Sequence, residues 1–193
     1  MDYFQHIQKL HDQLKSVIAT GPDGSETDMD EAMRIGIDMI GSVNRNNGKV
    51  MIIGNGGSAA IASHLSIDLA RNGGVPAMTF NEATSLTCFG NDFGYEHVFS
   101  HQVALNGDKN DLLIAISSSG ASENILNAVA EARSRGCSVM TLSGFRSDNP
   151  LRSKGDLNYY VSSDHYGRVE LSHMTLCHAL IDMSGDSWSK EHV

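Results

Sequence analysis

Residues 50–58 read VMIIGNGGS, and this stretch decides the fold. The apolar run at 50–53 predicts a buried strand, and a helical pattern at 58–71 follows the glycine-rich turn. Consecutive backbone N–H groups at the start of such a helix can face a bound oxyanion, and glycine lets that ligand approach closely. The stretch therefore predicts a strand, turn and helix with an anion site at the turn.

The same alternation of short apolar runs and helical patterns continues along the chain. Helical patterns occupy 122–135 and 169–183, and further strands are predicted at 77–80, 112–116, 139–142 and 157–161. Continuous apolar strands joined by helices are typical of a parallel sheet covered on both faces. We therefore expect an α/β protein with a five-stranded parallel sheet in a three-layer α-β-α sandwich.

Two helices are expected before any strand. Apolar residues at steps of three and four predict a helix from Tyr3 to Val17, and a capping-box-like motif at 27–30 starts a second helix that ends near Asn46. The first apolar stripe is close to a heptad, which fits packing on another subunit. Covering one edge of the sheet explains it equally well. We expect a single domain over 1–193, with a helical arm for oligomerisation at 1–47 and the α/β core at 48–185.

Length and composition restrict the class of protein. A chain of 193 residues fits one domain, and 14 basic against 23 acidic residues give a net charge of −9, which disfavours nucleic acid and anionic membranes as partners. The three cysteines form no C-x-x-C pair, which fits a reducing cytoplasm. No basic, apolar leader opens the chain, and the apolar runs are far too short to span a membrane. We expect a soluble cytoplasmic protein.

A second loop in the sequence distinguishes between a dinucleotide and a simple phosphate ester as the ligand. Read with the next residues, the loop at Gly54 also fits G-x-G-x-x-A, with Glu82 as a candidate ribose carboxylate, which would suit a nicotinamide-linked enzyme. Residues 117–122 read SSSGAS and repeat the arrangement of strand, loop and helix. A dinucleotide needs one such loop, and one capping serine suffices for a helix. Four hydroxyls beside a glycine therefore favour a dedicated phosphate cradle and no nucleotide cofactor.

Histidines and carboxylates lie on two of the predicted helices. His64 and Asp68 are four residues apart, share a helix face and follow the glycine loop closely. The last helix carries Glu170, His173 and His178; we expect His173 to be a core residue and His178 to be functional. Eight helical residues rise about 12 Å. Glu170 and His178 can therefore reach one ligand only through long side chains, a bent helix or different subunits.

These features together resemble the sugar-isomerase (SIS) fold, which is flavodoxin-like, and within it the phosphoheptose isomerases. The resemblance covers almost the whole chain. It rests on the helical arm, the two loops, the GNDFG motif at 90–94 after the apolar run at 86–89, and the last helix from Glu170 to His178. We expect the GNDFG motif in a loop or at a helix cap.

The resemblance implies an intramolecular oxidoreductase, an aldose–ketose isomerase that interconverts sedoheptulose 7-phosphate and D-glycero-D-manno-heptose 7-phosphate through an enediolate. It implies a homotetramer with active sites between subunits. The implied catalytic residues are Asp68, His178 and Glu170, and the implied ligands of Zn²⁺, or of another divalent transition metal, are His64, Asp68, Glu170 and His178. The implied substrate-binding residues are Asn55, Gly56, Gly57, Ser58, Asn91, Asp92, Ser117, Ser118, Ser119, Ser122 and Glu170.

The chain departs from the family pattern at its acidic residues. The family has glutamate at Asp68, glutamine at Glu170 and Asp-Arg where this chain has Gly167-Arg168, while Arg71 is one position away from a family arginine. Either Asp68 or Glu170 could act as the base. Two carboxylates beside a phosphate dianion repel one another, so we expect a stronger dependence on metal than in a glutamine-containing relative.

A non-catalytic SIS protein is the main alternative. Such proteins sense phosphosugars or bind a replication initiator, and they need the serine cradle but no acid–base pair. The presence of His64, Asp68, Glu170 and His178 together favours the enzyme. A nicotinamide-linked oxidoreductase is the third candidate, and the serine loop disfavours it.

Overall fold

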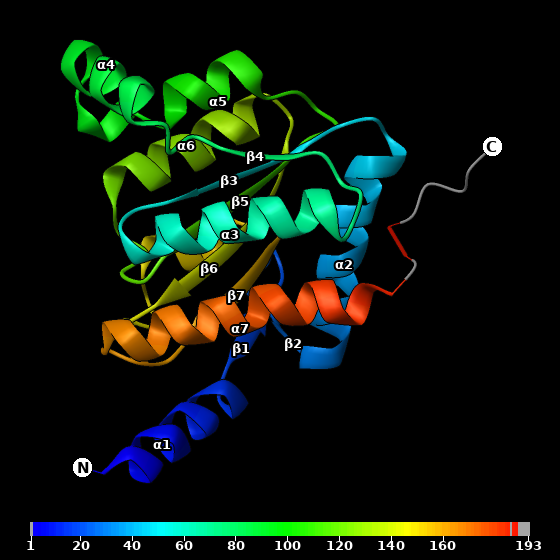
Figure 1. Ribbon diagram of the computed structural model, residues 1–193, viewed down its shortest axis with the longest axis vertical. Helices are drawn as coiled ribbons and strands as arrows, with labels where there is room; N and C mark the ends of the chain where they lie inside the picture. Colours follow the sequence, from blue (N-terminus) through cyan, green and yellow to red (C-terminus); the bar gives the residue numbers. More distant parts are fainter. Residues whose placement is uncertain (1, 186, 189–193) are drawn as a thin grey trace.

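The computed structural model describes residues 2–185, 187 and 188. Helices cover both faces of one twisted sheet, with α3 (Gly57–Arg71) and α7 (Tyr166–Ser184) side by side on one face (Figure 1). This confirms the predicted α/β class. The other helices are α1 (Tyr3–Lys15), α2 (Met29–Arg45), α4 (Ala83–Phe93), α5 (Ser100–Asn106) and α6 (Glu123–Ser134), with 3₁₀ turns η1 (Tyr95–His97) and η2 (Pro150–Ser153).

The sheet has seven described strands in the order β2-β1-β7-β6-β5-β3-β4. Five of them are parallel neighbours, at the places where the apolar runs predict strands. They are β3 (Val50–Gly54), β4 (Ala77–Thr79), β5 (Leu112–Ser117), β6 (Ser138–Gly144) and β7 (Leu157–Val161). Because these five strands run parallel, their carboxyl ends lie along one edge of the sheet.

The prediction of five parallel strands alone was wrong in one detail. Two short strands, β1 (Ile18–Thr20) and β2 (Glu26–Thr27), extend the sheet beyond β7 and make it mixed, since β1 pairs antiparallel with both of its neighbours. The expectation that two helices precede any strand is corrected by the same segment. Strands of three and two residues are too short to produce an alternating pattern in the sequence.

Alternate residues of the central strands enter two separate cores. Val50 and Ile52 face one core with side chains of α2, α3 and α7, while Met51 and Ile53 face a second core with α5 and α6. All four are fully buried. This two-sided burial explains why the strands appear in the sequence as continuous apolar runs.

The two N-terminal helices differ in their burial. No residue of α1 is buried, and its aromatic side chains Tyr3 and Phe4 are 69% and 80% exposed. By contrast, α2 packs on the sheet through residues such as Ile40. It begins directly after Asp28, whose carboxylate accepts hydrogen bonds from the N–H groups of the first turn and so caps the helix.

Trp188 fixes the last described residues against α2. Its indole N–H donates to the carbonyl of Ile37 at 2.8 Å, and Asn44 donates back to the Trp188 carbonyl at 2.8 Å. The Trp188 side chain is 3% exposed.

Among the described helices, none has the length and hydropathy that a membrane span requires.

Candidate phosphate cradle and acid–base site

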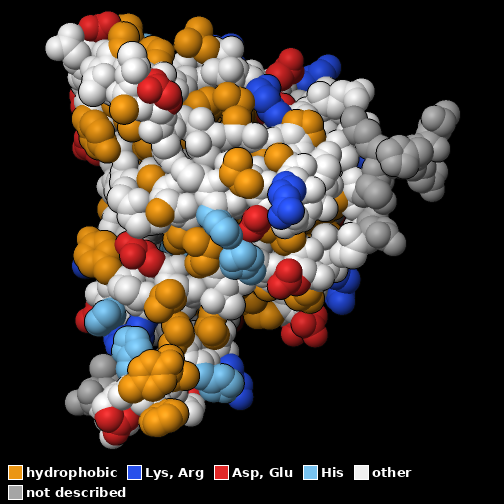
Figure 2. All heavy atoms as spheres, in the orientation of Figure 1, with side chains coloured by type: hydrophobic (Ala, Val, Ile, Leu, Met, Phe, Trp, Pro, Cys, Tyr) orange, Lys and Arg blue, Asp and Glu red, His pale blue; other side chains and the backbone are white. Residues whose placement is uncertain are grey.

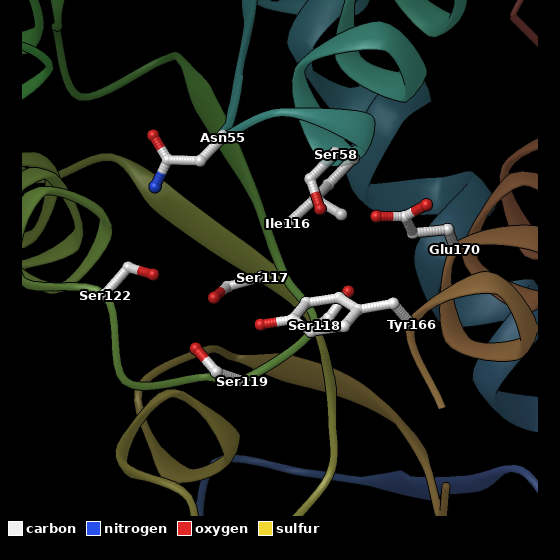
Figure 3. Close-up of a pocket in the computed structure, with 9 residues that line it drawn as sticks. All are labelled: Asn55, Ser58, Ile116, Ser117, Ser118, Ser119, Ser122, Tyr166 and Glu170. Atoms are coloured by element: carbon white, nitrogen blue, oxygen red, sulfur yellow. The ribbon is translucent and has the colours of Figure 1, made fainter. Parts of the chain in front are cut away.

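A cavity of about 130 Å³ lies where β3 and β5 end. The ends of two neighbouring parallel strands thus deliver the glycine loop and the serine loop to one place (Figure 3). Helix α7 closes the cavity from a third side. The lining residues are Asn55, Ser58, Ile116, Ser117, Ser118, Ser119, Ser122, Tyr166 and Glu170.

The serine loop offers hydroxyl groups that are free to bind a ligand. The hydroxyl of Ser118 is buried without a hydrogen-bond partner among the described residues, and Ser122 caps α6 without a side-chain hydrogen bond. The hydroxyl of Ser117 instead accepts the Gly120 N–H at 3.1 Å and holds the turn. Burying a hydroxyl without a hydrogen-bond partner costs free energy, so the arrangement suits a ligand that supplies acceptors.

Asn149 packs directly against Gly120 in the turn of the serine loop. Gly120 has φ +62°, and a β-carbon there would lie 2.0 Å from Oδ1 of Asn149. That oxygen accepts the Arg152 N–H at 3.1 Å, while the Asn149 amide donates to the Gly144 carbonyl at 3.1 Å. Only glycine therefore fits at the centre of the loop, both for its backbone conformation and for the space it leaves.

The two loops are joined by a pair of amide side chains. Asn55 and Asn124 exchange hydrogen bonds of 2.9 Å in both directions, and the Tyr95 hydroxyl donates to Oδ1 of Asn55 at 3.2 Å. Helix α3 starts behind Asn55 with no side-chain cap, and the N–H groups of Ser58 and Ala59 donate to the carbonyls of Asn55 and Gly56 at 3.0 Å. The positive end of the α3 dipole still faces the cavity, which favours an anion there.

Glu170 projects from α7 over the first turn of α3. A β-carbon on Gly57 would lie 2.5 Å from both Cδ and Oε1 of Glu170, so glycine is what allows the carboxylate to come this close. The start of a helix favours a negative charge. Glu170 also lines the cavity that the serine loop lines.

A second group of side chains lies farther along the same two helices. Oδ2 of Asp68 is 3.2 Å from Nε2 of His64 and 3.8 Å from Nδ1 of His178. The ligand atoms of these three residues all lie within 4.8 Å of one another, and we call them the His–Asp–His cluster. Figure 2 shows histidine side chains together on the face that carries α3 and α7.

The structure thus brings together three of the four residues that the resemblance assigns to a metal. Asp68 has 18% of its side chain exposed, and the two imidazoles have about half, so a ligand can reach the cluster from solvent. Glu170 is outside the cluster, because eight helical residues separate it from His178 by about 12 Å along α7.

The GNDFG residues are elsewhere in the described subunit. Asn91 and Asp92 occupy the last turn of α4, which Gly94 ends with φ +87°. They are exposed and do not line the cavity. The Asn91 amide donates to Asp92 at 2.9 Å, and Cys88 Sγ lies 3.7 Å from the same carboxylate.

Two residues of the last helix compare differently with the sequence predictions. His173 is the core residue that we expected: it is fully buried, its Nε2 donates to the Ser143 carbonyl at 3.1 Å, and burial lowers its pKa from 6.5 to about 4. The cavity residue Tyr166 was missed. An isolated aromatic residue just before a predicted helix carries no periodic signal that could have identified it.

A doubly wound sheet with a glycine loop and a serine loop at its carboxyl edge is a ligand-binding α/β domain, in which ligands bind at the ends of the strands. The family described as the SIS domain matches residues 22–144 of this chain. A phosphoheptose isomerase of Helicobacter pylori (strain HPAG1) is 40% identical over 143 residues, which are 71% of this chain and 74% of the relative. One from Campylobacter concisus is 36% identical over 77% of this chain and 82% of the relative.

Solved structures agree with these relatives. The phosphoheptose isomerase of Neisseria gonorrhoeae matches with a TM-score of 0.75 and 33% identity, over 79% of this chain and 85% of that one. That of Francisella tularensis matches with a TM-score of 0.80 and 29% identity, over 94% of both chains. This chain belongs to the phosphoheptose isomerases of the SIS family.

Proposed function

We propose that this protein is an aldose–ketose isomerase that converts sedoheptulose 7-phosphate to D-glycero-D-manno-heptose 7-phosphate. The observation that supports the proposal is that α3 and α7 lie side by side, with the serine-lined cavity at their first turns and the His–Asp–His cluster farther along them. The names of the relatives support the same reaction. The reaction moves one proton between two neighbouring carbons and one between their oxygens, so it needs an anchor, a base and a group that exchanges hydroxyl protons.

The anchor is the serine loop with the start of α6. The hydroxyls of Ser118 and Ser122 have no partner among the described residues and donate to the phosphate oxygens in this proposal. Ser58, Ser117, Ser119 and the glycines at 56 and 57 complete the cradle around the ester. Neutral donors at a helix start suit an anion because the helix dipole is positive there.

Two carboxylates are candidates for the base that moves the carbon-bound proton. Glu170 lies in the cavity beside the cradle, whereas Asp68 lies in the His–Asp–His cluster, about two helical turns away. A seven-carbon chain anchored by its phosphate extends from the first towards the second. Asp68 therefore suits a base at C1 and C2, and Glu170 suits contact with hydroxyls nearer the phosphate. His178, beside Asp68, moves the proton between O1 and O2.

The donor set of the His–Asp–His cluster fits zinc. Two imidazole nitrogens and one carboxylate oxygen are a common catalytic zinc set that leaves a position open for substrate. If an ion were held there, it would supply a positive charge that polarises the substrate carbonyl. Nickel, iron and manganese accept the same ligands. Glu170 of the same subunit is outside the cluster, so as a fourth ligand it would have to come from a neighbouring subunit.

The proposed assembly is a cytoplasmic homotetramer in which the arm at 1–47 contributes to the contacts. Its support is the exposed aromatic surface of α1, where Tyr3 and Phe4 are mostly exposed. Asn91 and Asp92 are exposed on α4, away from the cavity of their own subunit. In a tetramer they would contact substrate hydroxyls in a neighbouring active site.

The decisive experiment is NMR-monitored incubation with sedoheptulose 7-phosphate, with and without zinc. The wild type should form the aldose product. Asp68→Asn and His178→Ala should each abolish turnover while leaving sugar-phosphate binding, measured by thermal shift, largely intact. Binding without any product in the wild type would favour a phosphosugar sensor, and retained turnover in both variants would refute the assigned roles.

A further inference from the structure

Tyr166 stands at the mouth of the cavity. It is the first residue of α7 and lines the cavity together with the serine loop. Figure 3 shows its side chain reaching from α7 into the cavity, with the hydroxyl end foremost. Yet Tyr166 is 62% exposed, so burial in a core does not explain its position.

Phe145 holds this ring in place. The two rings meet edge to face, with centroids 4.8 Å apart and planes at 81°, a favoured arrangement of aromatic pairs. Phe145 has φ +57°, a backbone conformation that is disfavoured for any residue with a β-carbon. Its N–H donates to the Ser163 carbonyl at 3.0 Å, and its own carbonyl accepts the Tyr160 hydroxyl at 2.8 Å. These bonds maintain the strained backbone that places the Phe145 ring against Tyr166.

The charge of the cavity indicates a role for the Tyr166 hydroxyl as a hydrogen-bond donor. No lysine or arginine is among the residues that line the cavity, and Glu170 adds a negative charge. The donors that one subunit offers to a phosphate dianion there are therefore neutral. Each additional O–H donor then matters, because hydrogen bonds to a charged acceptor are about twice as strong as bonds between neutral groups.

We propose that Tyr166 is a substrate-binding residue that closes the phosphate end of the site. Its hydroxyl donates to an oxygen of a phosphate monoester held by the serine loop, and its ring shields that ester from water. Phe145 is a positioning residue that keeps the Tyr166 ring over the cradle. The inference deepens the proposed function, on which it rests for the identity of the ligand as a sugar phosphate.

Tyr166→Phe tests the hydroxyl. We expect KM for sedoheptulose 7-phosphate to rise about tenfold with kcat unchanged, since one hydrogen bond to a charged group is lost. The Kd for inorganic phosphate, measured by calorimetry, should rise by a similar factor. Tyr159→Phe, which removes a hydroxyl that donates to the Ala32 carbonyl and does not line the cavity, is the matched control and should change neither value. Unchanged KM and Kd in Tyr166→Phe would overturn the proposal.

Phe145→Ala and Phe145→Gly test the positioning role. Both remove the ring, but only glycine also removes the backbone strain, so the melting temperature should be higher for the glycine variant. KM should nevertheless rise about fivefold in both variants, with kcat unchanged, because both lose the aromatic contact. A change in melting temperature without a change in KM would show that Phe145 is only structural and would overturn its assigned role.

The phosphate titration separates this inference from the proposed function. A wild type that forms no product, but whose phosphate binding weakens in Tyr166→Phe, would refute the isomerase and support the role of Tyr166. If the wild type isomerises the sugar and Tyr166→Phe has the same kinetics as the wild type, the isomerase is supported and the role of Tyr166 is refuted.

Discussion

The carboxylate of Glu170 occupies the space that a side chain at Gly57 would need: a β-carbon there would be 2.5 Å from Cδ of Glu170. Because Gly57 has no β-carbon, α7 can place the Glu170 carboxylate directly against the first turn of α3. The Glu170 carboxylate lines the same cavity as the serine loop, so it would repel an anion bound there unless it contacts another part of the ligand.

Gly57→Ala should inactivate the enzyme without unfolding it. The new methyl group must push the Glu170 carboxylate away, and a displacement of about 1 Å in an active site can reduce the rate about a hundredfold. Alanine is a better helix former than glycine, so the melting temperature should not fall greatly. Steady-state kinetics and thermal unfolding test this. Gly21→Ala is the control, because its β-carbon would meet only ordinary contacts of 3.5 Å or more; equal activity of both variants would contradict the prediction.

Zinc binding should depend on the His–Asp–His cluster. His64→Ala should lower zinc affinity at least tenfold, since even outer partners of metal ligands contribute about 10- to 100-fold. Glu170→Gln should leave the affinity within about twofold if three ligands from one subunit suffice. Calorimetric titration of the metal-free protein measures both. A large loss of affinity in Glu170→Gln would instead show that Glu170 of a neighbouring subunit completes the site.

The stability of the protein should decrease in mild acid because of His173. Burial lowers the folded-state pKa of His173 to about 4, while the unfolded chain has the ordinary value near 6.5. Between these values the unfolded state binds more protons, so the free energy of unfolding falls as the pH falls from about 6.5 to about 4, by roughly 3 kcal/mol in total.

Urea denaturation at pH 7 and pH 4.5 measures that decrease. His173→Gln can still donate to the Ser143 carbonyl but does not titrate, so the difference between the two pH values should shrink. His11→Gln replaces an exposed histidine and should leave the difference as in the wild type. The same pH dependence in all three proteins would exclude His173 as its source.

Trp188 should contribute strongly to stability. Removing a buried tryptophan side chain typically costs about 3–5 kcal/mol, and Trp188→Ala should approach this range because the ring is 3% exposed. Trp188→Phe keeps most of the apolar contact but loses the hydrogen bond to Ile37, which is worth about 1 kcal/mol. Urea denaturation should therefore rank the wild type above Trp188→Phe and Trp188→Ala last. Equal stability of the two variants would contradict the packing role.

The central sheet was predictable because burial on two faces makes strands such as β3 and β5 continuously apolar. The edge strands β1 and β2 were not, since two or three residues have no period and pair only because β7 is beside them. Likewise, α4 runs through the apolar residues at 86–89 and includes Asn91 and Asp92, which were expected in a loop or at a helix cap.

The candidate site also has features that the sequence predicts and features that depend on tertiary packing. The position of the serine loop was predictable because it follows an apolar strand and precedes a helix, as the glycine loop does, and the i,i+4 spacing placed His64 beside Asp68. The approach of His178 to Asp68 depends on how α3 packs beside α7, which no spacing within one helix encodes. Tyr166 depends on a ring contact with Phe145, a residue on another segment of the chain.

The antiparallel pairing of β1 with β7 has a consequence for solubility. β1 occupies the hydrogen-bonding groups along one side of β7, and the outermost strand that remains, β2, is two residues long and carries the exposed Glu26. Short, charged outer strands resist recruitment of a foreign chain. The N-terminal segment therefore also protects the fully buried strand β7 from self-association, and removing it would expose an aggregation-prone border.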